Sequence, residues 1–411
     1  MANQHKLSGS ELIVKKFGGT SVGSIERIEA VAEQIAQAFY QGEQQLIVLS
    51  AMAGETNRLL SLGAAIDSHA SSRELDMLVA TGEQVSIALM AMALHKRGIA
   101  AKSLIAGQIS IMTDANHGRA KIERIDTSTL TALLADNVIP IVAGFQGCHQ
   151  GNITTLGRGG SDTTAVALAA ALSAKECQIY TDVAGVFTTD PNLETNAVKL
   201  SQINVDTMFE MARLGAKVLH PDSVDYARRF QVPLRVLSSF EPGCGTLITP
   251  QEEPLTQGRI VGMAVSHSQA IIHLQRSPQH PIVWDSLADQ LAAIGIETNL
   301  LSKDESSHLG LSFTVDKLWL PKVLTMLDLM ASEQVIESVQ YVDNQVRLSL
   351  IGNGLLDHVD VMNKARSELS EIDVDVNLMS ATAAKVAMVF CESKLNVAIR
   401  ALHYAFQLND Q

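Results

Sequence analysis

The chain has 411 residues, an apolar content of 46% and a formal net charge of −13. Its length predicts two or three domains, and its acidic balance argues against nucleic acid as a partner, because binding a phosphate backbone needs a basic surface. No signal-like segment begins the chain, and no apolar run approaches the ~20 residues that span a bilayer. The four cysteines are scattered, which argues against a disulfide framework and a zinc site. We therefore expect a cytoplasmic protein with no contact to membrane and no metal site of its own.

The first part of the chain, residues 11–249, alternates short apolar strands with helical segments. This alternation predicts an α/β fold, a mostly parallel open sheet with helices on both faces. Strands are expected at residues 12–17, 46–50, 139–145, 177–181 and 233–237. Between the first two strands, apolar side chains recur at three- and four-residue steps and predict one buried helix face: Ile25, Ile28, Ala32, Ile35 and Phe39. Two prolines and a glycine in residues 250–258 predict a linker.

Beyond this linker lies an internal repeat. Residues 294–302 match residues 372–380 position by position, and each copy lies between a strand and helix before it and a strand and helix after it. Two βαββαβ units are the simplest interpretation. Such units bury their sheet edges or faces against each other or against a second subunit, so we predict a homodimer formed through this half. The sequence leaves open whether the two units are sequential or interleaved.

The first segment that indicates chemistry is an apolar strand that runs into Gly18-Gly19 and then a helix. Adjacent glycines let backbone N–H groups close around a phosphate, and a helix N-terminus favours negative charge. Lys16 lies at the strand end, where its ammonium would reach a transferring phosphoryl group. Similar turns occur in α/β proteins that bind no nucleotide, so the function of this turn depends on the later segments.

A second glycine-rich loop, residues 157–160, precedes an alanine-rich helix expected at residues 162–172. Its glycines and the helix N-terminus predict an anion site, and Arg158 adds a bidentate partner for a carboxylate or phosphate. Ser161 and Asp162 would also serve as an ordinary helix cap. Three glycines in four positions beside an arginine exceed what a cap requires, so we favour the functional interpretation.

Other polar residues follow strands at the same sheet edge. Thr181-Asp182 comes at the carboxyl end of a buried strand, where open α/β sheets bind ligands, whereas Asp190-Pro191 alone indicates only a turn. Ser50 and Thr56 follow the second strand. Glu83 lies in a helical pattern, where it would bind a substrate ammonium or, as a single acidic residue does by default, lie on a solvated face.

Taken in order, these motifs resemble those of the aspartate kinases, in the amino-acid kinase superfamily. The resemblance rests on the segments that begin Lys16-Phe-Gly-Gly, Gly157-Arg-Gly-Gly-Ser-Asp, Tyr180-Thr-Asp-Val and Gly215-Ala-Lys-Val-Leu-His-Pro. It covers essentially the whole chain, because the family also carries two C-terminal ACT domains of βαββαβ type. It implies a kinase domain over residues 1–250, a linker over 251–259, and ACT domains over 260–341 and 342–411.

The resemblance implies transfer of the ATP γ-phosphoryl group to the side-chain carboxylate of L-aspartate, with Mg²⁺ held by the phosphates and water. The carboxylate is already ionised, so no general base is needed. The implied catalytic residues are Lys16 and Lys217, which neutralise charge, and Asp162, which orients them. The implied nucleotide-binding residues are Lys16, Gly18, Gly19, Ser50, Thr181, Asp182, Phe187, Thr188, Asp190 and Lys217. The implied aspartate-binding residues are Thr56, Glu83, Arg158, Gly159, Gly160 and Ser161.

The chain departs from the family pattern in two regions. Asn192 stands where relatives have arginine, and Phe187 where many have tyrosine. In the C-terminal half, residues 277–281 and 352–356 replace the Pro-Gly turns that surround an amino-acid effector, and residues 303–304 and 380–384 replace polar effector contacts. The packing residues persist. We predict that this half keeps a dimerisation role while feedback by lysine or threonine is weakened.

Two alternatives remain. One is an amino-acid kinase for another carboxylate such as glutamate, against which Arg158, Glu83 and the ACT pair count. The other is a regulatory or scaffolding paralogue with poor catalysis, supported only by Asn192 and opposed by the intact Lys16, Asp162 and Lys217.

Overall fold

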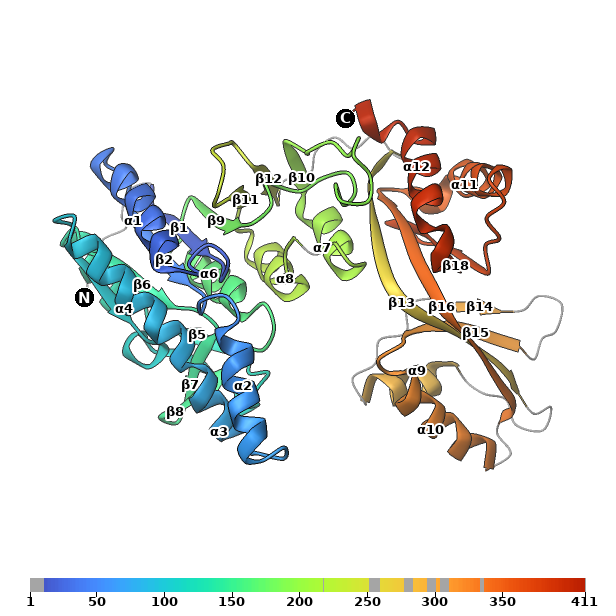
Figure 1. The fold of residues 1–411 in the computed structure, drawn as a ribbon, viewed down its shortest axis with the longest axis horizontal. Coiled ribbons are helices and arrows are strands. Elements are labelled where there is room, and N and C mark those ends of the chain that lie inside the picture. Colours follow the sequence, from blue (N-terminus) through green and yellow to red (C-terminus); the bar gives the residue numbers. More distant parts are fainter. Residues whose placement is uncertain are drawn as a thin grey trace, which may run out of the picture. The chain divides into compact units, whose positions relative to one another are not determined.

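The computed structural model describes residues 11–216, 218–250, 259–276, 284–293, 301–303, 310–332 and 336–410. The predicted linker, Lys217 and most of the first copy of the repeat lie outside these residues. The described chain divides into two compact units (Figure 1). The first comprises residues 11–186, 199–212 and 218–250, and the second comprises residues 187–198, 213–216 and those from 259 onward.

The first unit is built on an eight-stranded sheet of order β10-β12-β11-β9-β1-β2-β6-β3. Its strands are β1 (Ile13–Phe17), β2 (Gln45–Leu49), β3 (Ala101–Leu104), β6 (Ile139–Ala143), β9 (Glu176–Thr181), β10 (Gln202–Asn204), β11 (Leu234–Ser238) and β12 (Thr246–Thr249). All neighbours are parallel except β11 and β12. The predicted strands are all present, and the prediction of a mostly parallel open sheet is confirmed.

Helices connect these strands. They are α1 (Ile25–Tyr40), α2 (Glu55–Ile66), α3 (Ser72–Val79), α4 (Thr81–His95), α5 (Ser128–Ala135), α6 (Gly160–Ala171), α7 (Val205–Arg213) and α8 (Pro221–Phe230). Helix α1 begins where the Ser24 side chain accepts a hydrogen bond from the Arg27 backbone N–H. Its predicted apolar face packs on the sheet through Ile28, Ala32 and Ile35, but Ile25 is 55% exposed because it lies in the first turn, beyond the packed surface.

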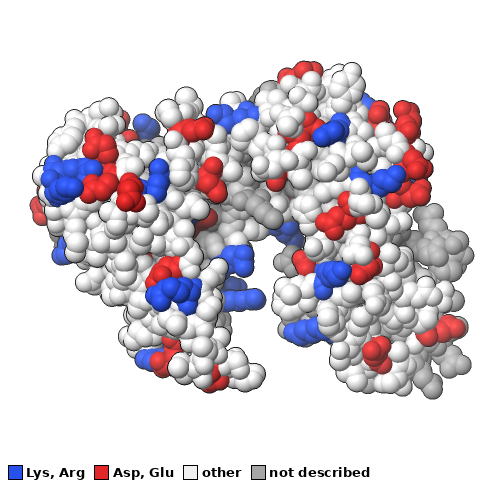
Figure 2. Space-filling view, viewed as in Figure 1, with Lys and Arg blue, Asp and Glu red and all other residues white. Residues whose placement is uncertain are grey.

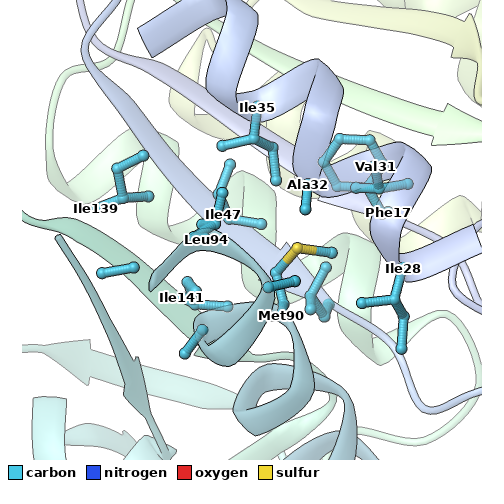
Figure 3. Close-up of a cluster of buried hydrophobic side chains, with 14 of the residues drawn as sticks. Phe17, Ile28, Val31, Ala32, Ile35, Ile47, Met90, Leu94, Ile139 and Ile141 are labelled. Atoms are coloured by element: carbon cyan, nitrogen blue, oxygen red, sulfur yellow. The ribbon is translucent and has the colours of Figure 1, made fainter. Parts of the chain in front are cut away.

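The core between α1, α4 and the sheet is shown in Figure 3. Apolar side chains from both helices meet those of the three neighbouring strands β1, β2 and β6. The central residues are Phe17, Ile35, Ile47, Met90, Leu94 and Ile141, each at most 2% exposed. This packing fixes the carboxyl ends of β1, β2 and β6 relative to one another.

The first unit also contains a four-stranded sheet with the strand order β5-β4-β7-β8. It contains β4 (Ile111–Thr113), β5 (Ile122–Ile125), β7 (Gln146–His149) and β8 (Asn152–Thr155). Strands β7 and β8 form a hairpin whose turn contains Gly151, with φ of +82°. The hairpin returns the chain to the glycine-rich loop at residue 157.

One helical stretch, Ser72–His95, is long and apolar enough by length and composition to cross a membrane, contrary to the expectation from apolar runs alone. Its most apolar window is 56% buried inside the protein. Core helices of globular proteins share this length and composition. Here the stretch consists of α3 and α4, which lie largely inside the protein. On the face in Figure 2, acidic and basic side chains are interspersed over each unit.

The second unit contains a six-stranded sheet of order β14-β15-β13-β16-β18-β17. Its elements are β13 (Ile260–Arg276), α9 (Trp284–Ala293), β14 (Leu301–Lys303), β15 (Gly310–Asp316), α10 (Leu320–Ser332), β16 (Ile336–Gly352), α11 (Val359–Glu371), β17 (Leu378–Ala381), β18 (Lys385–Cys391) and α12 (Leu395–Ala405). The order of elements matches two βαββαβ repeats. The two repeats are interleaved through the long strands β13 and β16, which pair along their lengths.

The interleaving follows from which core each half-strand joins. Ile260, Met263 and Val265 of β13 pack with α11 and α12 of the second repeat. Ile272 and Leu274, further along the same strand, pack with α9 and α10 of the first repeat. Each repeat therefore completes its sheet with residues from the other, so neither core closes without both.

We expect Leu94→Ala to lower the free energy of unfolding by about 2–5 kcal/mol, because it opens a cavity in the core that links α4 to the sheet. Urea denaturation followed by circular dichroism measures this loss. Met92→Ala on the same helix is the control, since Met92 is 64% exposed and should change stability by less than about 0.5 kcal/mol. Equal losses for the two variants would contradict the assigned core.

Candidate functional site

A pocket of about 350 Å³ opens in the first unit where the carboxyl ends of β1, β2 and β6 meet the start of α6. Parallel strands bring such ends to one sheet edge, the usual ligand position in open α/β sheets. The pocket is lined by Lys16, Gly19, Ser50, Ala51, Met52, Ala53, Gly54, Thr56, Asn57, Glu83, Phe145, Gly157, Arg158, Gly159, Gly160, Ser161 and Asp162. Thus all six residues predicted to bind aspartate share one pocket with Lys16, Gly19, Ser50 and Asp162.

Two of the charged residues that line the pocket, Lys16 and Asp162, form an ion pair. The Lys16 Nζ lies 2.6 Å from Asp162 Oδ1, and both side chains are largely buried. Lys16 comes from β1 and Asp162 from the first turn of α6, where the helix dipole also favours a carboxylate. The pair holds the ammonium at the sheet edge without removing its charge, so it remains able to stabilise an incoming anion.

The glycine turns are dictated by close approach. Gly159 has φ of +72°, and a Cβ there would overlap the His220 side chain. A Cβ at Gly19 would lie 2.9 Å from the Ala51 carbonyl oxygen, so only glycine lets this turn reach the loop after β2. Gly18 does not line the pocket; its N–H donates to the Tyr180 carbonyl oxygen at 3.1 Å.

Glu83 is a buried carboxyl group in the pocket, and its pKa is shifted. It is 3% exposed, and its Oε1 accepts the Ala51 backbone N–H at 3.1 Å, while its Oε2 is buried with no hydrogen-bond partner in the structure. Burial raises the pKa of Glu83 to about 7, against which the hydrogen bonds from backbone N–H groups act. The default expectation of a solvated face is wrong, because Gly82 lets α4 approach Ala51 and carries Glu83 inward. A buried carboxylate with one unpartnered oxygen is a group whose hydrogen bonding a ligand donor would complete.

The remaining predicted nucleotide residues lie elsewhere. Thr181 and Asp182 are at the carboxyl end of β9, next to β1, with the Thr181 hydroxyl donating to Asp182 Oδ1 at 3.0 Å. Phe187, Thr188 and Asp190 belong to the second unit.

Within that unit, Thr188 is fully buried. Its hydroxyl oxygen accepts the Val198 N–H and lies 3.0 Å from His403 Nε2, so protein groups occupy it. Asp190 is exposed, and its Oδ1 accepts hydrogen bonds from the backbone and side chain of Asn192, both at 2.9 Å. Lys217 lies outside the described residues.

Some pocket residues were not selected from the sequence. Phe145 has φ of +71°, and its N–H donates to the Thr164 hydroxyl, which turns its side chain toward the glycine loop at Gly160. Its place as the last residue of the predicted strand 139–145, directly after Gly144, is the only signal, and the observed β6 ends two residues earlier at Ala143. Asn57 follows Thr56 but carries no motif of its own. The Ala51 N–H was undetectable, because backbone donors leave no trace in residue type.

Among the residues that the structure describes, no group of three or more His, Cys, Asp or Glu side chains is arranged to hold a metal ion. The pocket itself offers Asp162 and Glu83 as carboxylates, of which Asp162 is paired with Lys16. Any divalent cation used here would therefore need most of its ligands from a bound phosphate chain and from water.

The chain is similar to known proteins over nearly its whole length. The model of the family described as "Amino acid kinase family" matches residues 11–238. The aspartate kinase of Pseudomonas putida is 44% identical over 402 residues, covering 97% of this chain and 98% of the relative. Aspartokinase III of E. coli, solved in complex with aspartate and ADP, superposes with a TM-score of 0.81 at 26% identity and covers 96% of this chain and 99% of its own.

We expect the stability difference between Glu83→Gln and the natural chain to depend on pH. Between pH 4.5 and 7 the unfolded chain releases the Glu83 proton and the folded chain keeps it, so the free energy of unfolding falls as pH rises. Glutamine removes this contribution, and the variant should gain about 3 kcal/mol relative to the natural chain from pH 4.5 to pH 8. Urea denaturation across this range measures it.

The matched control is Glu74→Gln, since the Glu74 side chain is 63% exposed. Its difference from the natural chain should stay constant with pH to within about 0.5 kcal/mol. A pH-independent difference for Glu83→Gln would show that this carboxyl titrates alike in the folded and unfolded states.

Proposed function

The chain belongs to the amino acid kinase family and, within it, to the aspartate kinases, and on this premise we propose that it transfers the γ-phosphoryl group of ATP to the side-chain carboxylate of L-aspartate. The observation that carries the proposal is the single pocket in which Lys16 and Asp162 lie with Glu83 and Arg158. One pair suits a phosphoryl group, and the other suits the two ends of an amino dicarboxylate.

The substrate ammonium would pair with Glu83, whose Oε2 has no protein partner. Arg158 would bind a carboxylate through its planar donors, while Thr56 and Ser161 add hydroxyls at the pocket wall. The second carboxylate is then the nucleophile. It is ionised at neutral pH, so the protein needs only to align it and to neutralise charge as the phosphoryl group moves.

Charge neutralisation would fall to Lys16, to the amides of the glycine turns and to Lys217. Asp162 would orient Lys16, as the 2.6 Å contact supports. ATP would extend past Gly18 and Gly19 toward Thr181 and Asp182, with Phe187, Thr188 and Asp190 contributing as in the family pattern. For Thr188 this contribution is limited to holding the backbone, because its hydroxyl is already bonded. Mg²⁺ bound to the phosphates would supply further positive charge.

A coupled hydroxamate assay with ATP, Mg²⁺ and either L-aspartate or L-glutamate tests the proposal directly. Product with aspartate and little with glutamate supports it. Preference for glutamate would favour the alternative kinase, and no product with either would favour a regulatory paralogue.

Lys16→Ala should lower kcat about 10²–10³-fold, because it removes a preorganised cation from the site of developing charge. Steady-state kinetics with ATP and aspartate measure the loss, and the melting temperature checks folding. Lys96→Ala is the matched control: Lys96 is 72% exposed and pairs with Glu29 on the surface, so kcat should change less than about twofold. Unchanged kcat in Lys16→Ala would remove this lysine from catalysis.

We also propose that feedback by amino acids is weakened. E. coli aspartokinase III has been solved in complex with lysine and aspartate, and it superposes with a TM-score of 0.77 at 25% identity. In this chain two amides of the 352–356 segment are already bonded internally: Gly352 N–H donates to the Ala384 carbonyl oxygen at 3.0 Å and Leu355 N–H to that of Ala383 at 2.9 Å. An effector would have to displace these bonds. The corresponding first-repeat segment, 277–281, lies outside the described residues.

The remaining expectations are proposals of the same kind. The protein would act in the cytoplasm, at the start of a route to lysine, threonine or diaminopimelate, and would form a homodimer through the ACT repeats of the second unit.

Lysine and threonine, added singly and together at up to about 5 mM, should lower the aspartate kinase rate less than about twofold, because the internal amide bonds compete with an effector. The coupled assay at subsaturating aspartate measures this response. A relative that is inhibited under the same conditions serves as the positive control. Inhibition above tenfold by either amino acid would contradict weakened feedback.

A further inference from the structure

Asp76 in α3 carries a buried carboxylate that lies outside the pocket and accepts several hydrogen bonds. It is 2% exposed. Its oxygens accept the His117 Nδ1–H at 2.7 Å, the Gly118 N–H at 3.1 Å, the Thr155 N–H at 3.1 Å and the Thr155 hydroxyl at 2.5 Å. Three chain segments distant in sequence therefore converge on one side chain.

Two of these segments lead directly to the pocket loop. Thr155 ends β8, and Gly157 and Arg158 follow it within three residues. The turn at residues 117–120 lies against the same loop: Ala120 N–H donates to the Thr155 carbonyl oxygen at 2.8 Å, and a Cβ on Gly157 would lie 3.1 Å from the Gly118 carbonyl oxygen. Asp76 thus fixes the base from which Arg158 projects.

The third segment leads to the other end of the pocket. Asp76 precedes the α3–α4 junction, where its carbonyl oxygen accepts the Ala80 N–H and the Ala80 carbonyl oxygen accepts the Gln146 side-chain amide at 3.2 Å. Glu83 lies one turn further, in α4. Gln146 belongs to β7, the hairpin partner of β8, so the same small sheet anchors the supports of both Glu83 and Arg158.

A buried carboxylate is costly unless its oxygens are fully bonded, and removing one partner leaves an uncompensated group. The hydrogen bonds at Asp76 therefore hold α3 and β8 in place, since a shift of α3 relative to β8 would break both bonds to Thr155. A core that needed only stability would serve as well with apolar side chains. Hydrogen bonds are directional, so the bonds at Asp76 also fix how α3 and β8 are placed relative to each other.

We propose that Asp76 is a positioning residue that sets the separation of Glu83 and Arg158, and with it the length of the amino dicarboxylate that the pocket accepts. The inference rests on the proposed function, because it assigns Glu83 and Arg158 to the two ends of the substrate. Aspartate and glutamate differ by one methylene, so a fixed separation discriminates between them. A loosened separation admits both.

Asp76→Asn tests this role. It replaces one carboxylate oxygen with an amide nitrogen, which cannot accept hydrogen bonds from the four donors, and it nearly preserves the side-chain volume. The KM for aspartate should rise about 10-fold or more, the KM for ATP should stay within about twofold, and the ratio of kcat/KM for aspartate over glutamate should fall at least about fivefold. Thr155→Val, which removes only the hydroxyl donor, should move the same quantities in the same direction by less.

Gln45→Leu is the matched control. Gln45 is also buried and doubly bonded, to Lys15 Nζ and the Ile35 carbonyl oxygen, but lies at the amino end of β2, away from the pocket. It should lower the melting temperature without changing the aspartate-to-glutamate ratio. Thr155→Val carries the test if Asp76→Asn does not fold.

An unchanged ratio in a folded variant, or a rise of both KM values together, would overturn the positioning role. An unmodified chain that phosphorylates neither amino acid would instead overturn the proposed function, and the inference with it. The two failures are distinct, because the first requires an active natural chain.

Discussion

The ion pair between Lys16 and Asp162 is the interaction on which the pocket depends. It joins the end of β1 to the start of α6, and both partners are largely withdrawn from water. Such a pair persists only when the surrounding backbone fixes its geometry, because desolvation otherwise exceeds the attraction. The glycine turns at residues 18–19 and 157–160 supply that backbone. The pair therefore fixes where an anion is stabilised at the sheet edge.

The second constraint is Glu83, a buried carboxyl group without a hydrogen-bond partner for each of its oxygens. Glu83 is left with one unpartnered oxygen and a pKa raised by burial, and a substrate ammonium beside this oxygen would offset the cost of that burial. Asp76, one helix earlier, is equally buried but fully bonded. Two carboxylates seven positions apart thus differ in how completely their oxygens are bonded, because one oxygen of Glu83 has no partner. We propose binding for Glu83 and support for Asp76.

Much of this could be predicted from the sequence, for identifiable reasons. Lys16, Arg158 and Asp162 lie in motifs with unusual glycine density, and glycine density reports backbone geometry directly. Most strands of the first unit can be recognised in the sequence as largely apolar segments, because both faces of the sheet are covered. Asp76, Phe145 and the Ala51 N–H gave no such signal, since their roles arise from partners between 19 and 79 residues away.

By itself the sequence determined the class of fold, the repeat, and the residue types that meet at the sheet edge, because periodicity and glycine spacing are local properties. Only the tertiary structure decided that Glu83 is buried, that the repeats are interleaved through β13 and β16, and that Thr188 is bonded within the second unit. Each of these depends on which distant segment covers a side chain. Burial and pairing are properties of the packed chain, and they decide whether a polar residue binds a substrate or supports the fold.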